Sequence, residues 1–308
     1  MYCISSDTDN PYYNLALEEF LLKNRTEEYF ILSINNTCVV AGKHQCLHRE
    51  ADTRFVTENN IPVLRRITGG GTVFHDRGNL NFCFIRNAEP GRQIDYQRHL
   101  LPVTGYLAKF GIETTIRGSD VITNGLKISG NAEHVFRSRV LHHGTLLWEA
   151  SLENLHNCIR KDTSSYKTRA VPSRPTPVTN LSGRLKKFRN ISEFRSDMLD
   201  YFLNTVESTS AYNLNNEEIE GIDMLSEKYR TWEWNYAYGP EYEFSNEIKI
   251  RDRNVRYSLI VKDGIIMDCR IDDSEWGVVA ERLKGCRHMP AEIELAMKDQ
   301  NVDPFIFF

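Results

Sequence analysis

The sequence predicts an α+β protein with a large N-terminal domain and a small C-terminal domain. The chain has 308 residues, which is more than one domain usually holds. Helical and strand patterns follow one another along it, and its 41% hydrophobic and 26% charged residues are typical of a globular protein. After a turn at Gly239-Pro240 the pattern changes to closely spaced strands. We therefore expect domains at 1–240 and 241–308.

Periodicity and turn residues predict the elements of the first domain in order. Asn10 and Pro11 begin an amphipathic helix that runs to Asn24. The Asn124-Gly125 pair predicts a tight hairpin. Two short strands joined by a turn are predicted within 29–40. Further strands are predicted at 62–67, 81–85, 112–116, 121–123, 127–129 and 140–148. Helices are predicted at 94–110, 191–206 and 216–229. Residues 161–179 predict a long loop, a kind of segment that often carries function.

The tail has a strand-rich pattern of its own. Strands are predicted at 247–251, 256–262 and 265–271, with a turn at Asp263-Gly264 and helices at 276–283 and 291–298. This stretch of residues is long enough to form a small packed unit.

Charge and cysteine usage exclude several classes of protein. The net charge of -4 argues against a protein whose main task is binding nucleic acid. The N-terminus lacks the features of an export signal and no stretch is apolar enough to span a bilayer, so we expect a cytoplasmic protein without a membrane partner. Seven single cysteines without a CxxC pair predict reduced thiols. His44, Cys46 and His48 alternate, but no second ligand cluster accompanies them, so we expect no metal held by a direct cluster.

The most informative stretch is the glycine-rich segment at residues 65–76. The triplet Gly69 to Gly71 lets the backbone approach an anion closely, and the guanidinium of Arg66 can bind a carboxylate or phosphate. The segment is neither a Walker loop nor a dinucleotide fingerprint, since Phe74 occupies the third glycine position of the latter. The ordinary alternative is a glycine-rich turn beside surface arginines.

Two further stretches carry candidate polar groups. Lys127 follows the predicted hairpin turn, where its charge can reach oxygens that become negative during phosphoryl or acyl transfer. Asp120 precedes the hairpin. The ordinary alternatives are that Lys127 is a solvent-exposed surface lysine and that Asp120 is a turn residue without a function. His142 and His143 are neighbours on a strand, so they point to opposite faces and only one can face a given site.

Together these stretches resemble the lipoate-protein ligase A family. The resembling segments are residues 10–19, 39–45, 65–76, 78–79, 120, 127–132, 142–147, 173–181 and 232–234. Their order and spacing cover most of residues 10–240. The sequence departs from the pattern at Asn131, where many members have Ser, at Thr68, where some have Ser, and in a shortened tail.

The resemblance implies a fold and a set of site residues. The fold is a mixed-sheet catalytic domain of the biotin/lipoate protein ligase type, with a small α+β C-terminal domain that moves over the active site. Lys127 resembles the family's essential lysine, which contacts the acyl-adenylate. The residues that resemble the substrate and adenylate pocket are Arg66, Thr68, Gly69, Gly70, Gly71, His75, Asn79, Asp120 and His143.

The implied activity is that of an ATP-dependent lipoate-protein ligase. Lipoate would be converted to lipoyl-AMP with ATP and Mg²⁺, the latter bound through ATP and by Asp120, and then transferred to a lysine. The implied acceptors are lipoyl domains of 2-oxoacid dehydrogenase complexes and the glycine-cleavage H protein. We expect an apolar slot, lined by Phe74 and Leu147, to hold the acyl chain, because each buried CH₂ contributes roughly 0.8 kcal/mol.

Three alternatives remain open from the residues. An octanoyl or lipoyl transferase on the same fold would use an activated cysteine without ATP, and Cys83 is the candidate, although it lies in an apolar strand. A biotin ligase is expected to carry a GRGRxGR pattern, which this sequence lacks. A noncatalytic binding protein would retain the fold without the complete set of polar groups.

Overall fold

The main body of the molecule is an eight-stranded mixed sheet. The computed structural model describes residues 1–88, 91, 94–250, 253–298 and 302–308. The strand order is β12-β1-β2-β6-β10-β9-β8-β7, with antiparallel pairs from β2 to β7 and parallel pairs at β1. The strands are β1 (Tyr2–Ser5), β2 (Tyr29–Ile34), β6 (Asn79–Asn87), β7 (Thr115–Arg117), β8 (Asp120–Thr123), β9 (Leu126–Phe136), β10 (Arg139–Leu147) and β12 (Ser210–Ala211). The predicted α+β class is confirmed.

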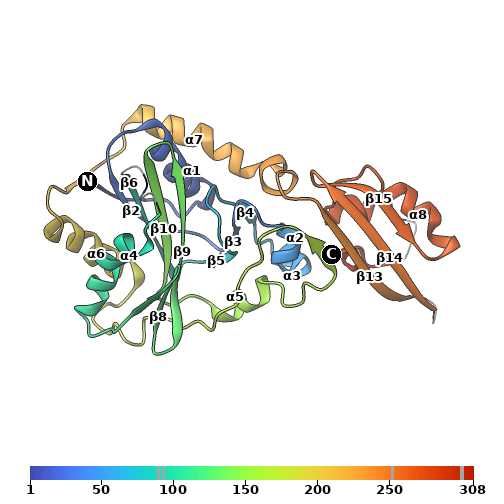
Figure 1. Ribbon diagram of the computed structural model, residues 1–308, viewed down its shortest axis with the longest axis horizontal. Coiled ribbons are helices and arrows are strands. Elements are labelled where there is room, and N and C mark those ends of the chain that lie inside the picture. Colours follow the sequence, from blue (N-terminus) through green and yellow to red (C-terminus); the bar gives the residue numbers. More distant parts are fainter. Residues whose placement is uncertain (89–90, 92–93, 251–252, 299–301) are drawn as a thin grey trace.

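Helices cover both faces of this sheet (Figure 1). On one face α4 (Tyr96–Ala108) and α6 (Ile191–Thr205) pack against the even-numbered residues of β6, such as Phe82. On the other face α1 (Pro11–Asn24) packs against the odd-numbered residues, such as Cys83, and α7 (Asn216–Arg230) packs on α1. The predicted start of α1 is confirmed, because the Asn10 side chain accepts from the N–H groups of the first turn.

A three-stranded sheet beside the main one carries the glycine-rich segment. Its order is β4-β3-β5, formed by β3 (Cys38–Ala41), β4 (Val63–Arg65) and β5 (Val73–His75). The two strands predicted within 29–40 are present as β2 and β3, and they belong to different sheets. The short helices α2 (Leu47–Glu50), α3 (Thr53–Glu58) and α5 (Leu152–Cys158) were not predicted, since they are too short to show a period.

The C-terminal part forms a separate four-stranded sheet with its own core. The order is β11-β13-β14-β15, formed by β11 (Tyr166–Thr168), β13 (Tyr242–Ile250), β14 (Arg253–Lys262) and β15 (Ile265–Ile271). Short helices accompany it: η2 (Ser274–Trp276), α8 (Gly277–Leu283), α9 (Pro290–Ala296) and η3 (Pro304–Phe307). The strand predicted at 247–251 lies within β13, apart from Arg251, which is outside the described residues.

A π-helix, η1 (Glu233–Ala237), connects α7 to the C-terminal sheet. In Figure 1 that sheet lies at the opposite end of the long axis from α4 and α6. Strand β11 comes from the predicted long loop, so this sheet includes residues on both sides of position 241. The domain limits at 1–240 and 241–308 stay a prediction.

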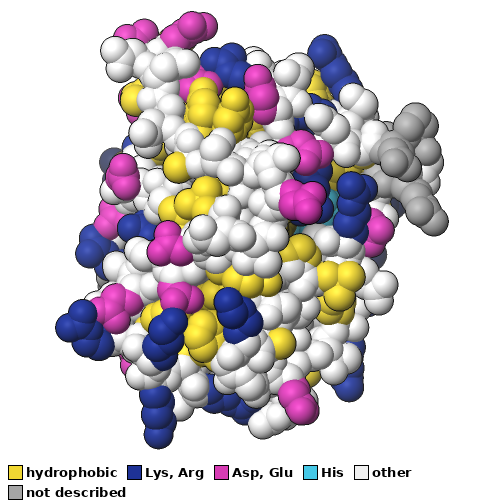
Figure 2. All heavy atoms as spheres, turned by 90° about the vertical axis from the view of Figure 1, so that its left-hand side faces the viewer, with side chains coloured by type: hydrophobic (Ala, Val, Ile, Leu, Met, Phe, Trp, Pro, Cys, Tyr) yellow, Lys and Arg dark blue, Asp and Glu magenta, His cyan; other side chains and the backbone are white. Residues whose placement is uncertain are grey.

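Surface charge follows the composition. Figure 2 shows Lys and Arg side chains interspersed with Asp and Glu on the end of the molecule that carries α4 and α6. Among the helices of the described residues, none has the length and apolar character that crossing a membrane requires.

Candidate active site

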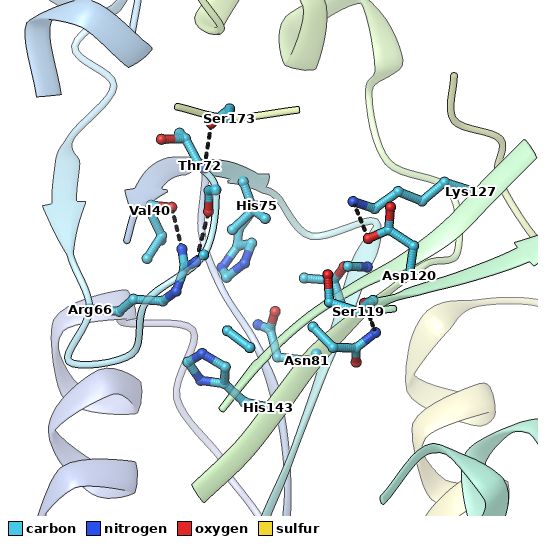
Figure 3. A pocket seen from close by; sticks show the side chains of 18 of the residues that line it. Val40, Arg66, Thr72, His75, Asn81, Ser119, Asp120, Lys127, His143 and Ser173 are labelled. Atoms are coloured by element: carbon cyan, nitrogen blue, oxygen red, sulfur yellow. Dashed lines mark hydrogen bonds and ion pairs between the residues drawn. The ribbon is translucent and has the colours of Figure 1, made fainter. Parts of the chain in front are cut away.

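A cavity of about 410 Å³ opens between the main sheet and the glycine-rich segment. All of its lining residues lie between Asn14 and Arg174, and none of them belongs to a strand of the C-terminal sheet. Seven of the residues predicted for the site line this cavity: Arg66, Gly70, Gly71, His75, Asp120, Lys127 and His143. Three lie outside the lining: Thr68, Gly69 and Asn79. In Figure 3, Lys127 and Asp120 lie on one side of the cavity, and Arg66, His75 and His143 lie on the other.

The guanidinium of Arg66 organises the glycine-rich loop from within. Its Nη2 donates to the carbonyl oxygens of Gly69 at 2.6 Å and Gly71 at 2.7 Å, and Nη1 donates to Val40 at 2.9 Å. Burial lowers the pKa of Arg66 to about 10, so it stays protonated at neutral pH. Gly70 has a φ of 85°, the left-handed region that glycine tolerates best. The fork of Arg66 is thus directed at the loop's own carbonyls, which fixes the shape of the loop.

A hydrogen-bonded chain connects Arg66 to α1. Arg66 Nε donates to Thr68 Oγ1 at 2.7 Å, and Thr68 Oγ1 lies 2.9 Å from His143 Nε2. His143 Nδ1 lies 2.7 Å from a carboxylate oxygen of Glu18. Thr68 therefore belongs to the site through its contacts, although it does not line the cavity.

Lys127 lies directly after the hairpin turn that the sequence predicted. Asn124 and Gly125 have φ values of 49° and 78°, as a tight hairpin turn requires. Lys127 Nζ forms an ion pair with Asp120 at 2.8 Å, and 21% of the lysine side chain is exposed. A Cβ at position 130 would lie 2.9 Å from Nζ, so Gly130 leaves the space that the lysine side chain occupies.

His75 and Asn79 each contact the side-chain amide of another asparagine. Asn35 Nδ2 lies 2.9 Å from His75 Nδ1, and Asn79 Nδ2 donates to Asn81 Oδ1 at 2.8 Å. Burial, followed by the charges of Arg66 and His143, lowers the pKa of His75 to about 3. His75 is therefore neutral at physiological pH.

Residues of the long loop 161–179 form one wall of the cavity. Ser173 Oγ accepts from the backbone N–H of Thr72 at 2.9 Å and from Gln45 Nε2 at 3.0 Å. Further along the loop, the carbonyl of Pro177 accepts from the backbone N–H of Lys127 at 2.8 Å. The loop thus joins the glycine-rich segment to the strand of Lys127, as expected of a loop that carries function.

The prediction that Phe74 and Leu147 line an apolar slot was wrong. Phe74 packs in a separate small core with Val39 and Cys158, and neither Phe74 nor Leu147 lines the cavity. The strand period explains Phe74: it neighbours His75, and successive side chains of a strand point to opposite faces. Cys83 is also outside the lining, and burial raises its pKa well above the ordinary value.

Sequence reasoning missed several polar residues of the site. Glu18 and Ser173 lie inside segments that carried the resemblance, but only the contacts reveal their part. Asn81 had a detectable signal, because a polar residue inside an otherwise apolar strand needs a partner. Gln45 gave no such signal, since its Nε2 donates to a loop more than a hundred residues away.

Comparison with known proteins agrees with this geometry. The family described as the lipoyl protein ligase A/B catalytic domain matches residues 10–203. Lipoate-protein ligase 1 of Staphylococcus aureus is 33% identical, covering 97% of this chain and 93% of the relative. Lipoate-protein ligase LplJ of Bacillus subtilis is 31% identical, covering 90% of this chain and 86% of the relative.

Solved structures share the fold. LipL1 of P. falciparum, in complex with lipoate, has a TM-score of 0.63 and 23% identity, and the match covers 98% of this chain and 95% of that one. A lipoate-protein ligase A bound with ATP has a TM-score of 0.65 and 21% identity, and the match covers 76% of this chain and 98% of that one. From the sequence relatives together with the matched catalytic domain, this chain belongs to the lipoate-protein ligase family of enzymes.

Proposed function

We propose that this chain activates lipoate with ATP and transfers the lipoyl group to a lysine of an acceptor protein. The observation that carries the proposal is the position of Lys127, which shares one cavity with the glycine-rich loop. A cationic side chain and a close-approaching backbone suit a reaction in which oxygens gain negative charge. The ATP-bound ligase of the same fold supports the choice of ATP as the activating substrate.

The first step makes a mixed anhydride. A carboxylate oxygen of lipoate attacks the α-phosphorus of ATP, the bond from that phosphorus to the bridging oxygen breaks, and pyrophosphate leaves. Lys127 Nζ stabilises the charge that develops on the α-phosphate oxygens. Its present partner, Asp120, keeps the ammonium oriented toward the cavity at a distance of 2.8 Å.

The second step forms the amide. The neutral ε-amine of the acceptor lysine attacks the acyl carbonyl, the bond from that carbon to the phosphate oxygen breaks, and AMP leaves with the electron pair. The amine nitrogen releases its proton to solvent. Lys127 again stabilises the phosphate charge. This route requires no thiol, and among the described residues no cysteine lines the cavity.

Mg²⁺ fits the residues at the same end of the cavity. Magnesium in nucleotide sites is held by one or two carboxylates together with phosphate oxygens. Asp120 is the carboxylate beside Lys127, and part of its side chain is exposed to the cavity. We assign it as the protein ligand for a magnesium ion that would neutralise phosphate charge.

The proposed acceptors are lipoyl domains of 2-oxoacid dehydrogenase complexes and the glycine-cleavage H protein. A solved archaeal ligase with the same fold is described together with its E2 lipoyl domain, at a TM-score of 0.63 and 24% identity. That description supports lipoyl domains as the class of acceptor. The H protein is included on the family resemblance alone.

We also propose that residues 241–308 form an accessory domain that acts on the cavity through the long loop. Strand β11 pairs with β13 of the tail, and Val171 to Arg174 of the same loop line the cavity only a few residues later. Truncation after residue 240 should impair adenylate formation more than transfer from chemically made lipoyl-adenylate. Equal loss of both half-reactions would assign the tail to transfer or to folding.

Exchange of radiolabelled pyrophosphate into ATP tests the proposed function directly. The intact protein, incubated with lipoate, ATP and magnesium, should catalyse exchange without any acceptor protein. A thiol-dependent transferase and a noncatalytic binding protein would both give no exchange. Transfer from an octanoylated donor protein without ATP would identify the transferase.

A further inference from the structure

The part of the cavity wall that the main sheet forms carries polar side chains. Ser33 of β2 lies opposite Asn81 of β6, and Asn81 lies opposite Thr145 of β10. All three side chains are buried, and all three line the cavity. Toward the other end of β6 the same face becomes apolar with Cys83 and Ile85. These side chains form a polar row across neighbouring strands, which we call the floor, defined by Ser33, Asn81 and Thr145 together with His75 of the adjoining three-stranded sheet.

The hydrogen bonds around His75 fix which of its ring nitrogens carries a proton. Asn14 Nδ2 donates to the backbone carbonyl of Thr8 at 3.1 Å, which sets the orientation of that amide. The same nitrogen lies 2.7 Å from Asn35 Oδ1, so Asn35 presents its oxygen to Asn14 and its Nδ2 to His75. His75 Nδ1 must then accept, and the neutral ring carries its proton on Nε2.

Two donors at the floor have no acceptor among the described residues. His75 Nε2 is buried without a hydrogen-bond partner. Asn81 uses its Oδ1 to accept from Asn79, and its Nδ2 is buried without a partner as well. Buried polar groups in native proteins are almost always paired, so an unpaired donor in a cavity indicates a ligand atom that accepts.

The floor lies where the tail of a bound acid would reach. Strands β6 and β9 are separated by β10, so Asn81 and the strand of Lys127 are about 10 Å apart at the usual strand spacing. An extended chain of seven or eight carbons is of similar length. At the opposite end, Arg117, Gly118 and Arg174 are exposed, as suits a nucleotide that enters from solvent. In Figure 3 the floor residues Asn81 and His75 lie away from Lys127.

We propose that the donors His75 Nε2 and Asn81 Nδ2 make this enzyme select acids that carry a hydrogen-bond acceptor near the end of the tail. The selected class includes the dithiolane sulfurs of lipoate and tail oxygens, and unsubstituted fatty acids of equal length are disfavoured. The inference rests on the proposed function, because it assumes that the cavity binds the acid to be activated.

The size of the discrimination follows from the cost of an unpaired donor. A plain hydrocarbon tail that fills the floor displaces solvent and leaves both donors without an acceptor. Sites built to hydrogen-bond a substrate reject the analogue that lacks the group far more strongly than apolar pockets reject a change in size. Sulfur is a weak acceptor, so we expect about tenfold for lipoate over octanoate and more for a carbonyl oxygen.

Three acids test the proposal with the unmodified protein. Pyrophosphate exchange is measured with lipoate, octanoate and 7-oxooctanoate, the last of which adds one oxygen to the octanoate chain. We expect kcat/KM for 7-oxooctanoate to exceed that for octanoate at least tenfold. Equal use of octanoate and 7-oxooctanoate would overturn the inference while leaving the ligase assignment intact. Absence of exchange with every acid would instead contradict the proposed function.

A substitution then assigns the selectivity to the floor. Asn81→Leu removes one of the two donors and should lower the ratio of 7-oxooctanoate to octanoate toward one, mainly by lowering KM for octanoate. Asn87→Leu is the matched control, because Asn87 is on the same strand and face but exposed outside the cavity. A purely structural role for Asn81 would lower kcat/KM for all acids by the same factor. Calorimetric binding of the acids without ATP gives the same comparison if the variant adenylates poorly.

Discussion

Two histidine–glutamate pairs lie on opposite faces of β10 and have different surroundings. His143 Nδ1 lies 2.7 Å from Glu18, and His142 Nδ1 lies 2.8 Å from Glu133. The two histidines are adjacent in sequence, so the strand period alone sends them to different sides. We call them the pocket pair and the sealed pair.

The two pairs differ in the further side chains that they contact and in whether they border the cavity. The pocket pair continues through Thr68 to Arg66 and borders the cavity. In the sealed pair, Glu133 also lies 3.0 Å from His99 Nδ1, and both of its histidines are buried outside the cavity lining. A histidine beside a carboxylate therefore does not by itself indicate a functional site. The difference is that the cavity lies on the face of β10 that carries His143. Pocket-side substitutions should affect activity, and sealed-side substitutions should affect stability.

The largest effect should come from Lys127→Ala on the pocket side. Loss of the ammonium removes charge stabilisation from both steps, and we expect kcat to fall by at least about 10³-fold. The free energy of unfolding should change by less than about 0.5 kcal/mol, because the side chain is partly exposed and outside the core. Kinetics and thermal unfolding check the two parts. Lys187→Ala, at an exposed lysine paired with Asp197, is the control. Near-normal ligation by Lys127→Ala would remove this residue from the mechanism.

The largest stability effect should come from Glu133→Gln on the sealed side. The carboxylate receives hydrogen bonds from two buried histidines and from the backbone N–H of Asp95 at 3.0 Å. Breaking such a buried network costs about 3 kcal/mol. Chemical denaturation should show this loss, while kcat/KM per folded molecule stays within about twofold. A large loss of activity with unchanged stability would reverse the comparison.

The sealed pair should also make stability fall in acid. Burial alone would raise the pKa of Glu133, but hydrogen bonds from His142 and His99 outweigh it and lower the pKa to about 2. Burial lowers the pKa of His142 to about 4. Both groups bind fewer protons when folded, so stability is lost as the pH falls, from about 6.5 for the histidine and about 4.5 for the carboxylate. Between pH 5 and pH 3, Glu133→Gln should lose less stability than the unmodified protein. Parallel curves would exclude Glu133 as the source.

A smaller effect on activity is expected from His143→Gln. His143 orients Thr68 and Arg66 and does not touch reacting atoms in the proposed steps, so kcat/KM should fall about tenfold. Thr68→Val and the double variant complete a mutant cycle. If the residues act as one chain, the double variant should be little worse than either single variant. Strictly additive losses would show that they act separately.

Local sequence signals predicted the elements that hold the site. Asn10 caps α1, Asn124-Gly125 makes the hairpin before Lys127, and the period of β10 placed one histidine on each face. Each of these depends on a few neighbouring residues. Such signals were sufficient to bring seven predicted residues to one cavity.

Contacts between distant segments were beyond this reasoning. Strand β11 forms only by pairing with β13, more than seventy residues later. The floor depends on the register of β2, β6 and β10, which no local pattern specifies. Phe74 was misassigned because an apolar residue in a functional segment can equally face a neighbouring core.

The smallest effect on activity is expected from Cys83→Ala, a substitution close to the cavity but outside its lining. Cys83 lies directly opposite His143 in the pairing of β6 with β10, yet its side chain packs in the apolar core and lies outside the cavity lining. Burial raises the pKa of its thiol well above the ordinary value, which disfavours the thiolate that a transferase requires. The substitution should cost about 1 kcal/mol of stability through a small cavity. Ligation should stay within about twofold, measured beside the unmodified protein at a temperature where both are folded. Loss of activity at unchanged stability would favour the transferase. It would also mean that the functional part of this face of β6 extends beyond Asn81 to Cys83.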